Sequence, residues 1–98
     1  MSKRYLSLRE EEIMAVLWHN GPMTIRELQN IFHIKLHFNT LSTHIRGLEK
    51  HGFVIHKNDG FRPYIYEPLI TEEKYLDRII ERLKSIYNRN ILQGRTLM

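Results

Sequence analysis

The stretch NTLSTHIRGLEKHG, residues Asn39–Gly52, decides the fold that we predict for this chain. Its first residue is of a type that caps helices, and its last is of the type that most often ends them. The apolar residues between them are Leu41, Ile45 and Leu48. At about 100° per residue these three fall on one narrow stripe, so the spacing predicts an amphipathic helix.

The opposite face of this helix is polar and carries no acid. It presents Asn39, Thr43, Arg46, Gly47 and Lys50, with Thr40 and Ser42 on its flanks. Such side chains reach phosphate oxygens and base edges, so the face is typical of a helix that enters a groove of duplex DNA. We expect Arg46 at a base edge or a phosphate, and Lys50 at a phosphate. An ordinary solvated helix would look similar, and the neighbouring elements decide between the two.

Two capping boxes precede this stretch, and each predicts the start of a short helix. They are Ser7-Leu8-Arg9-Glu10 and Thr24-Ile25-Arg26-Glu27. Gly21-Pro22 ends the first of the two helices. We interpret His33–Phe38 as the turn between the second and third helices, with Leu36 or Phe38 in the core. The order of elements predicts a helix-turn-helix unit.

After Gly52 the hydrophobic period changes from about 3.6 to about 2. Residues 53–57 and 64–67 are predicted strands, and Asn58-Asp59-Gly60 lies between them as a turn signal. A hairpin directly after a recognition helix forms a wing, in which Lys57 and Arg62 are candidates for phosphate contacts, as is Arg26 in the second helix. The fold class is therefore α+β and mainly α: a winged helix-turn-helix of three helices and a β-hairpin wing, followed by one more helix.

This last helix is expected from residue 72 to about residue 90. It is too long for a compact winged domain to cover, so its apolar stripe needs another partner, and a second copy of the chain is the one we expect. The alternative is a helix that folds back wholly onto its own domain. The predicted dimerisation residues are Tyr75, Leu76, Ile79, Ile80, Leu83, Ile86 and Tyr87. We accordingly divide the chain into a winged-helix domain, residues 1–70, and a dimerisation helix with its tail, residues 71–98.

Composition narrows the class of protein. The 98 residues carry a formal net charge of +4 and no cysteine. A positive charge favours a polyanionic partner. The absence of cysteine excludes disulfides, thiolate metal sites and cysteine nucleophiles, and it fits a reducing compartment. No apolar run approaches the roughly 18 residues of a membrane span, and the polar N-terminus is no signal peptide, so a cytoplasmic location is expected.

The six histidines raise a metal hypothesis that their spacing does not favour. His44 and His51 share one side of the third helix but lie about 10 Å apart along its axis, too far for one ion with bonds near about 2 Å. His33 and His37 lie in the connecting turn. We therefore expect no metal and no cofactor. With no nucleophile–base pair and no glycine-rich phosphate loop, we also expect no catalytic activity.

With these elements in place, the sequence resembles the penicillinase-repressor family, the BlaI/MecI type. The resemblance covers roughly residues 7–87, and the run from Tyr64 to Glu73 is its most specific part. Other matching segments are Glu11–Trp18, Thr24–Leu28, Asn39–Thr43 and Gly52–Val54. The resemblance implies a bacterial repressor that binds palindromic operator DNA as a homodimer, with the winged helix on DNA and the C-terminal helices forming the dimer.

Two departures from the family pattern bear on induction. Members usually continue for a helix or two beyond Tyr87. In the β-lactam-responsive members a protease that responds to a signal cleaves this additional region and so releases the repressor. A sensor or protease partner of that kind is thus a weaker expectation here. Copper-responsive members carry C-terminal cysteine pairs, which this chain lacks. Two alternatives stay open: a winged-helix module that binds a protein rather than DNA, and a DNA-binding protein with a small-molecule pocket beside the last helix.

Overall fold

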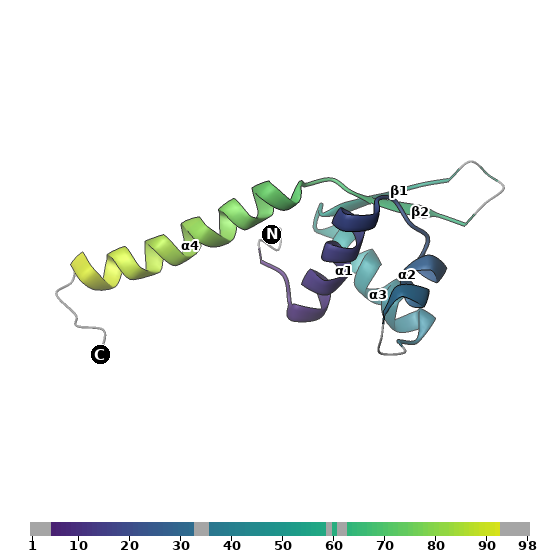
Figure 1. Cartoon of the computed structure of the whole chain (residues 1–98), viewed down its shortest axis with the longest axis horizontal. Helices are drawn as coiled ribbons and strands as arrows, with labels where there is room; N and C mark the ends of the chain where they lie inside the picture. The colour runs from purple at the N-terminus through teal and green to yellow at the C-terminus, as the bar shows by residue number, and fades with distance from the viewer. Residues whose placement is uncertain (1–4, 33–35, 59, 61–62, 93–98) are drawn as a thin grey trace.

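The computed structural model describes residues 5–32, 36–58, 60 and 63–92. Three helices come first, then a β-hairpin, then a long final helix (Figure 1). The elements are α1 (Leu8–Asn20), α2 (Ile25–Ile31), α3 (Phe38–Lys50), β1 (Val54–Lys57), β2 (Ile65–Pro68) and α4 (Glu72–Leu92). This order confirms the predicted winged-helix fold.

Both predicted capping boxes are present. At the start of α1, the Glu10 N–H donates to Ser7 Oγ at 3.3 Å and the Ser7 N–H donates to Glu10 Oε1 at 2.8 Å. At the start of α2, the Glu27 N–H donates to Thr24 Oγ1 at 3.1 Å and the Thr24 N–H donates to Glu27 Oε1 at 2.9 Å. Each box satisfies donors that a helix start leaves unpaired, so both helices begin where the sequence sets them.

Helix α3 ends as predicted and begins differently. Gly52 adopts φ +83°, its N–H donates to the Glu49 carbonyl at 3.0 Å, and the Phe53 N–H donates to the Leu48 carbonyl at 2.9 Å. This pair of bonds is a Schellman motif, which places a glycine just past the helix. The predicted cap at Asn39 is wrong. The cap residue is His37, which makes no side-chain capping bond. A capping side chain contributes only about 1 kcal/mol to helix stability. Burial of the apolar stripe of α3 contributes more and therefore fixes the position of the helix.

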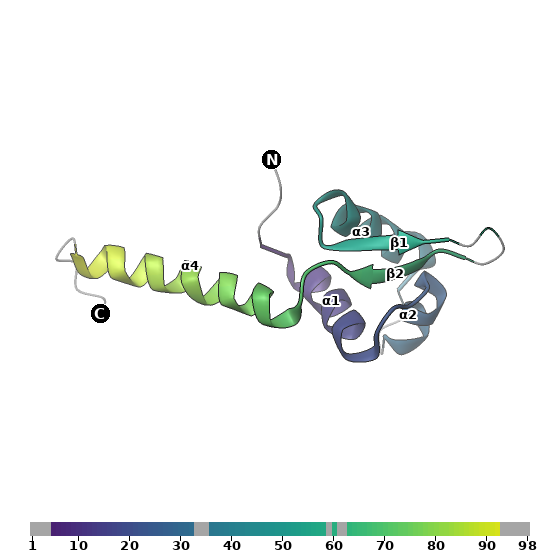
Figure 2. The same cartoon turned by 90° about the horizontal axis from the view of Figure 1, so that it is seen from above.

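The core lies where α1, α2, α3 and the hairpin meet. The hairpin packs on α3 through β1 and on α1 through β2 (Figure 2). The fully buried side chains are Ile13, Met14, Leu17, Leu28, Leu41, Ile45, Leu48, Phe53 and Val54. The apolar stripe of α3 is thus the part of that helix that faces the core, and its polar face is left outside.

The wing is an antiparallel hairpin in which Val54 pairs with Pro68 and Lys57 pairs with Ile65. A third short segment that the sequence does not indicate joins it. Met23 and Tyr66 exchange two backbone hydrogen bonds, at 3.0 and 2.8 Å. This bridge ties the loop before α2 to β2, so the hairpin and the helix-turn-helix unit form one body.

Helix α4 leaves the winged domain and extends away from it, which makes the molecule 60 Å long and about 25 Å across (Figure 1). Its first turn is still part of the domain. Tyr75, grouped above with the dimerisation residues, lies in the core at 2 % exposure and has almost no surface left for a partner. Its ring packs near Trp18 and Phe53, with centroids 5.7 and 6.0 Å away.

The hydroxyl of Tyr75 links three parts of the chain. It accepts a hydrogen bond from the Leu6 N–H at 3.0 Å and donates one to Glu11 Oε2 at 2.9 Å. About two turns further along α4, the Arg82 guanidinium lies 4.4 Å from the centroid of the Tyr5 ring. The residues before α1 therefore fasten the start of α4 to the winged domain.

Candidate nucleic-acid interface

The outer face of α3 carries the side chains that the sequence singled out. Asn39, Thr40, Thr43, Arg46 and Lys50 are exposed, and Ser42 is half-buried. Two of them also bond within the helix. The Thr43 hydroxyl donates to the Asn39 carbonyl at 2.9 Å, and Arg46 Nε donates to the Ser42 carbonyl at 3.4 Å. The guanidinium of Arg46 keeps its other donors for a ligand.

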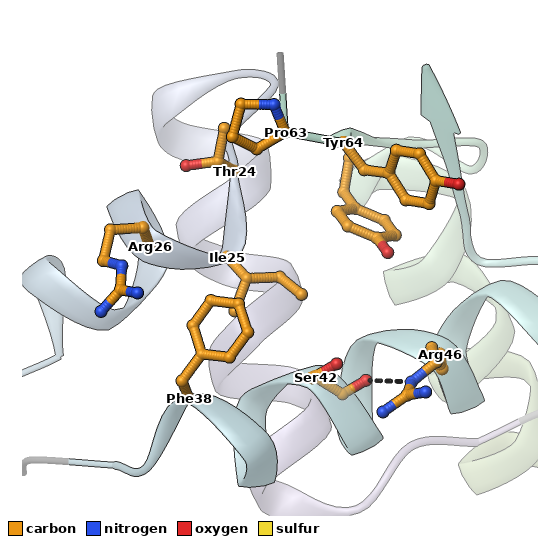
Figure 3. A pocket seen from close by; sticks show the side chains of 9 residues that line it. Thr24, Ile25, Arg26, Phe38, Ser42, Arg46, Pro63 and Tyr64 are labelled. Atoms are coloured by element: carbon orange, nitrogen blue, oxygen red, sulfur yellow. Dashed lines mark hydrogen bonds between the residues drawn. The ribbon is translucent and has the colours of Figure 1, made fainter. Parts of the chain in front are cut away.

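A groove of about 370 Å³ lies between the start of α2, the first turns of α3 and the start of β2 (Figure 3). It brings together three of the predicted residues, Arg26, Ser42 and Arg46. The other lining residues are Thr24, Ile25, Phe38, Pro63, Tyr64 and Tyr66. The helix-turn-helix unit and the wing thus share one concave surface.

The two arginines of the groove are available to an anion. Within the described part of the chain, neither Arg26 nor Arg46 forms an ion pair with a carboxylate. Arg26 lies over the ring of Phe38, 4.9 Å from its centroid, and makes one long bond to Gln29 at 3.5 Å. A guanidinium held on an aromatic face keeps its edge donors free, so both arginines remain able to bind phosphate.

The wing is less strongly positive than its sequence suggests. Lys57 forms an ion pair of 2.9 Å with Glu67 on the neighbouring strand, so its charge is already partly compensated. Arg62, the other wing residue singled out above, lies outside the described residues. Lys50 lies in the last turn of α3, away from the lining of the groove.

A cluster of polar and aromatic side chains packs against Tyr64, which lines the groove. His56 Nδ1 lies 2.6 Å from Glu49 Oε2, and the His56 ring stacks on Tyr64 with centroids 4.2 Å apart. Burial raises the pKa of Tyr66, nearby Glu49 raises it further, and Arg46 opposes them. The Tyr66 phenol therefore stays neutral at physiological pH, and the cluster fixes the start of β2 against α3.

The sequence did not single out the aromatic part of this surface. Phe38 was considered for the core, but it is the first residue of α3 and is 38 % exposed, whereas Leu36 packs partly buried against the core. Tyr64 was treated only as a strand residue, and it is 46 % exposed. The one available signal for Phe38 was its position directly before the polar residues Asn39 and Thr40 of the predicted recognition helix.

Within the ranges that the structure describes, no three His, Asp or Glu side chains gather in a way that could hold a metal ion. In the same ranges no helix has both the length and the apolar character needed to cross a membrane.

Three helices, a two-stranded wing and an acid-free outer face on the third helix define a winged-helix protein. The sequence profile of the penicillinase repressor family matches residues 6–92, and the chain belongs to that family. The family is one of transcriptional regulators, not of enzymes.

A solved structure gives the same fold. The chain is similar to the transcriptional regulator Tm0710 from Thermotoga maritima, with a TM-score of 0.60 and 18 % sequence identity. The alignment covers 92 % of this chain and 63 % of that one, so the present chain spans less than two thirds of its length. At this identity the likeness shows the fold alone. A sequence comparison with curated proteins gives no match.

Proposed function

We propose that the protein is a dimeric repressor that binds a palindromic operator, with each protomer presenting α3 to one half-site. The observation that carries this proposal is the apolar stripe of α4. Leu76, Ile80, Leu83 and Tyr87 are each about half exposed, at successive spacings of four, three and four residues. That spacing is the seam along which two helices pack.

The length of α4 supports the same proposal. Its 21 residues span about 31 Å at about 1.5 Å per residue, and beyond the first turn only one side meets its own domain. Ile79 and Ile86 lie on that side and are half-buried. The stripe beside them has no partner within the described part of the chain, and a second copy would bury it.

The proposed DNA-binding residues come from three elements. The face of α3 contributes Asn39, Thr40, Ser42, Thr43, Arg46 and Lys50; Arg26 comes from α2 and Lys57 from the wing. Arg62 stays a prediction outside the described residues. In a symmetric dimer the two α3 helices would meet half-sites about 34 Å apart, or a multiple of that distance.

The proposal is tested by selecting duplexes from a random pool at two salt concentrations, while the mass of the protein in solution is recorded. An enriched palindrome, a dimer mass and a steep fall of binding with salt are expected, because neutralised phosphates release counterions. Salt-sensitive binding with no enriched sequence would contradict an operator-specific repressor. No binding at low salt would favour the protein-interaction module instead.

Arg46→Ala and Lys50→Ala are expected to have different effects on operator binding. Arg46 is proposed to reach a base edge, so its loss should cost about 1–3 kcal/mol and relax sequence preference. Lys50 is proposed to reach a phosphate, so its loss should weaken all sequences alike. Titration of the selected operator and of a scrambled duplex separates the two. Wild-type affinity in both variants would show that the recognition face is wrongly assigned.

Gly47→Ala is expected to stabilise the free protein and to weaken DNA binding. A Cβ at Gly47 meets no atom of the chain within 4 Å, so alanine should add about 1 kcal/mol of helix stability. A DNA backbone that approaches this point would meet the new methyl group. Thermal unfolding and operator titration of the same sample measure both effects. A more stable variant with unchanged affinity would exclude close approach of DNA here.

A further inference from the structure

Phe38 occupies an unusual place for a large apolar side chain. It is the first residue of α3, at the end of the helix that the proposed function puts into the DNA groove, and it is 38 % exposed. Arg26 covers its ring at 4.9 Å from the centroid, and Figure 3 shows the ring beside Ile25. The ring is therefore held in position, and part of its surface opens to the groove.

The groove has apolar walls and a cationic rim. Ile25, Phe38, Pro63 and Tyr64 contribute hydrocarbon or aromatic surface, whereas Arg26 and Arg46 bring positive charge from α2 and α3. None of the described residues that line it is acidic. An occupant should therefore combine a small apolar group with nearby negative charge.

The edge of a thymine in duplex DNA has this combination. Its C5-methyl is the apolar group of the major-groove edge, and phosphates follow on both sides. Phenylalanine is among the side chains that contact this methyl, and the two arginines would lie towards the backbone. The groove opens beside the face that carries Ser42 and Arg46, so the same DNA would reach both.

We propose that this groove receives the C5-methyl of a thymine in each half-site, and that Phe38 makes the chain prefer thymine there. The proposal rests on the proposed function, since it requires α3 to face the operator. It adds a determinant of sequence preference that does not depend on hydrogen bonding. The polar residues of α3 read other positions.

The test replaces thymine by uracil, which removes one methyl group and leaves base pairing unchanged. Each thymine of the selected operator is replaced in turn, and binding of the full chain is titrated. At one thymine per half-site the wild-type protein should lose about three- to five-fold in affinity, the effect of one buried methyl group. Phe38→Ala should bind the thymine and uracil duplexes equally, and Phe38→Leu should keep part of the difference.

Ile31→Ala is the matched control, because Ile31 is also 38 % exposed but does not line the groove. It should keep the full difference between thymine and uracil. If wild-type protein binds the operator and no uracil replacement matters, the methyl site is excluded while the proposed function stands. An unchanged difference in Phe38→Ala would assign the methyl to another side chain. Failure to enrich any duplex would remove the proposed function and this inference together.

Discussion

Leu83→Asp is expected to convert the proposed dimer to a monomer. Operator binding should weaken by about 10²–10⁴-fold, because this is the gain in affinity that joining two binding sites provides. Leu83 lies in the middle of the exposed stripe of α4 and is 47 % exposed. A carboxylate there would be buried without a partner in the dimer and would remain hydrated in the monomer. Light scattering measures the mass, and titration of a full operator and of a single half-site measures binding.

Arg78→Gln is the control for this experiment. It also lowers the net charge by one, but at about 100° per residue it lies on the side of α4 opposite the stripe. It should leave the dimer intact. Because Leu83 contributes little to the core, half-site binding by Leu83→Asp should remain close to that of wild type. A Leu83→Asp protein that is still a dimer would place the interface elsewhere.

The largest effect on stability is expected at Tyr75. Tyr75→Ala removes a ring that packs near Trp18 and Phe53 in the core, and loss of a buried aromatic side chain costs about 3–5 kcal/mol. Tyr75→Phe keeps the ring and removes the hydroxyl, which leaves the Leu6 N–H and the Glu11 carboxylate without this partner. That change should cost about 1–3 kcal/mol. Denaturant unfolding of the two variants separates packing from hydrogen bonding.

The same hydroxyl should make the stability of the folded protein depend on pH. Burial raises the pKa of Tyr75 from 10.0 to about 12, with the Leu6 hydrogen bond opposing the shift and Glu11 adding to it. A raised pKa means that the folded state favours the neutral phenol. The stabilisation is therefore present below pH 10 and is lost as pH rises towards 12, by about 2–3 kcal/mol. Between pH 9 and 12 the free energy of unfolding of wild type should fall by this amount relative to that of Tyr75→Phe. Parallel pH dependences of the two proteins would contradict the prediction.

Local signals in the sequence predicted most of the fold. Ser7 with Glu10, Thr24 with Glu27, and Gly52 act through neighbours within a few residues, so they can be recognised without the rest of the chain. The apolar stripe of α3 likewise predicted which side would face the core. The wing followed from a change of period and a turn signal.

The features that sequence did not predict depend on residues far apart in the chain. The pairing of Met23 with Tyr66 joins positions 43 residues apart and leaves no periodic trace. Tyr75 shares the apolar spacing of α4, and only the contacts of Leu6, Glu11 and Trp18 place it in the core. Phe38 became part of the groove because α3 starts two residues earlier than a capping Asn39 would set it.

The fastening of α4 at Tyr75 also has a mechanical consequence. The helix extends from the winged domain, and the contacts at its start are centred on the buried side chain of Tyr75, with Ile79 and Arg82 adding contacts further along. Leu6 and Glu11 hold the Tyr75 hydroxyl, while Trp18 and Phe53 pack near its ring. In a dimer joined through the far part of α4, a small change in the angle between α4 and the winged domain would become a large displacement of α3. The stiffness of the junction around Tyr75 would then set how much variation in the spacing of the two half-sites the proposed repressor tolerates.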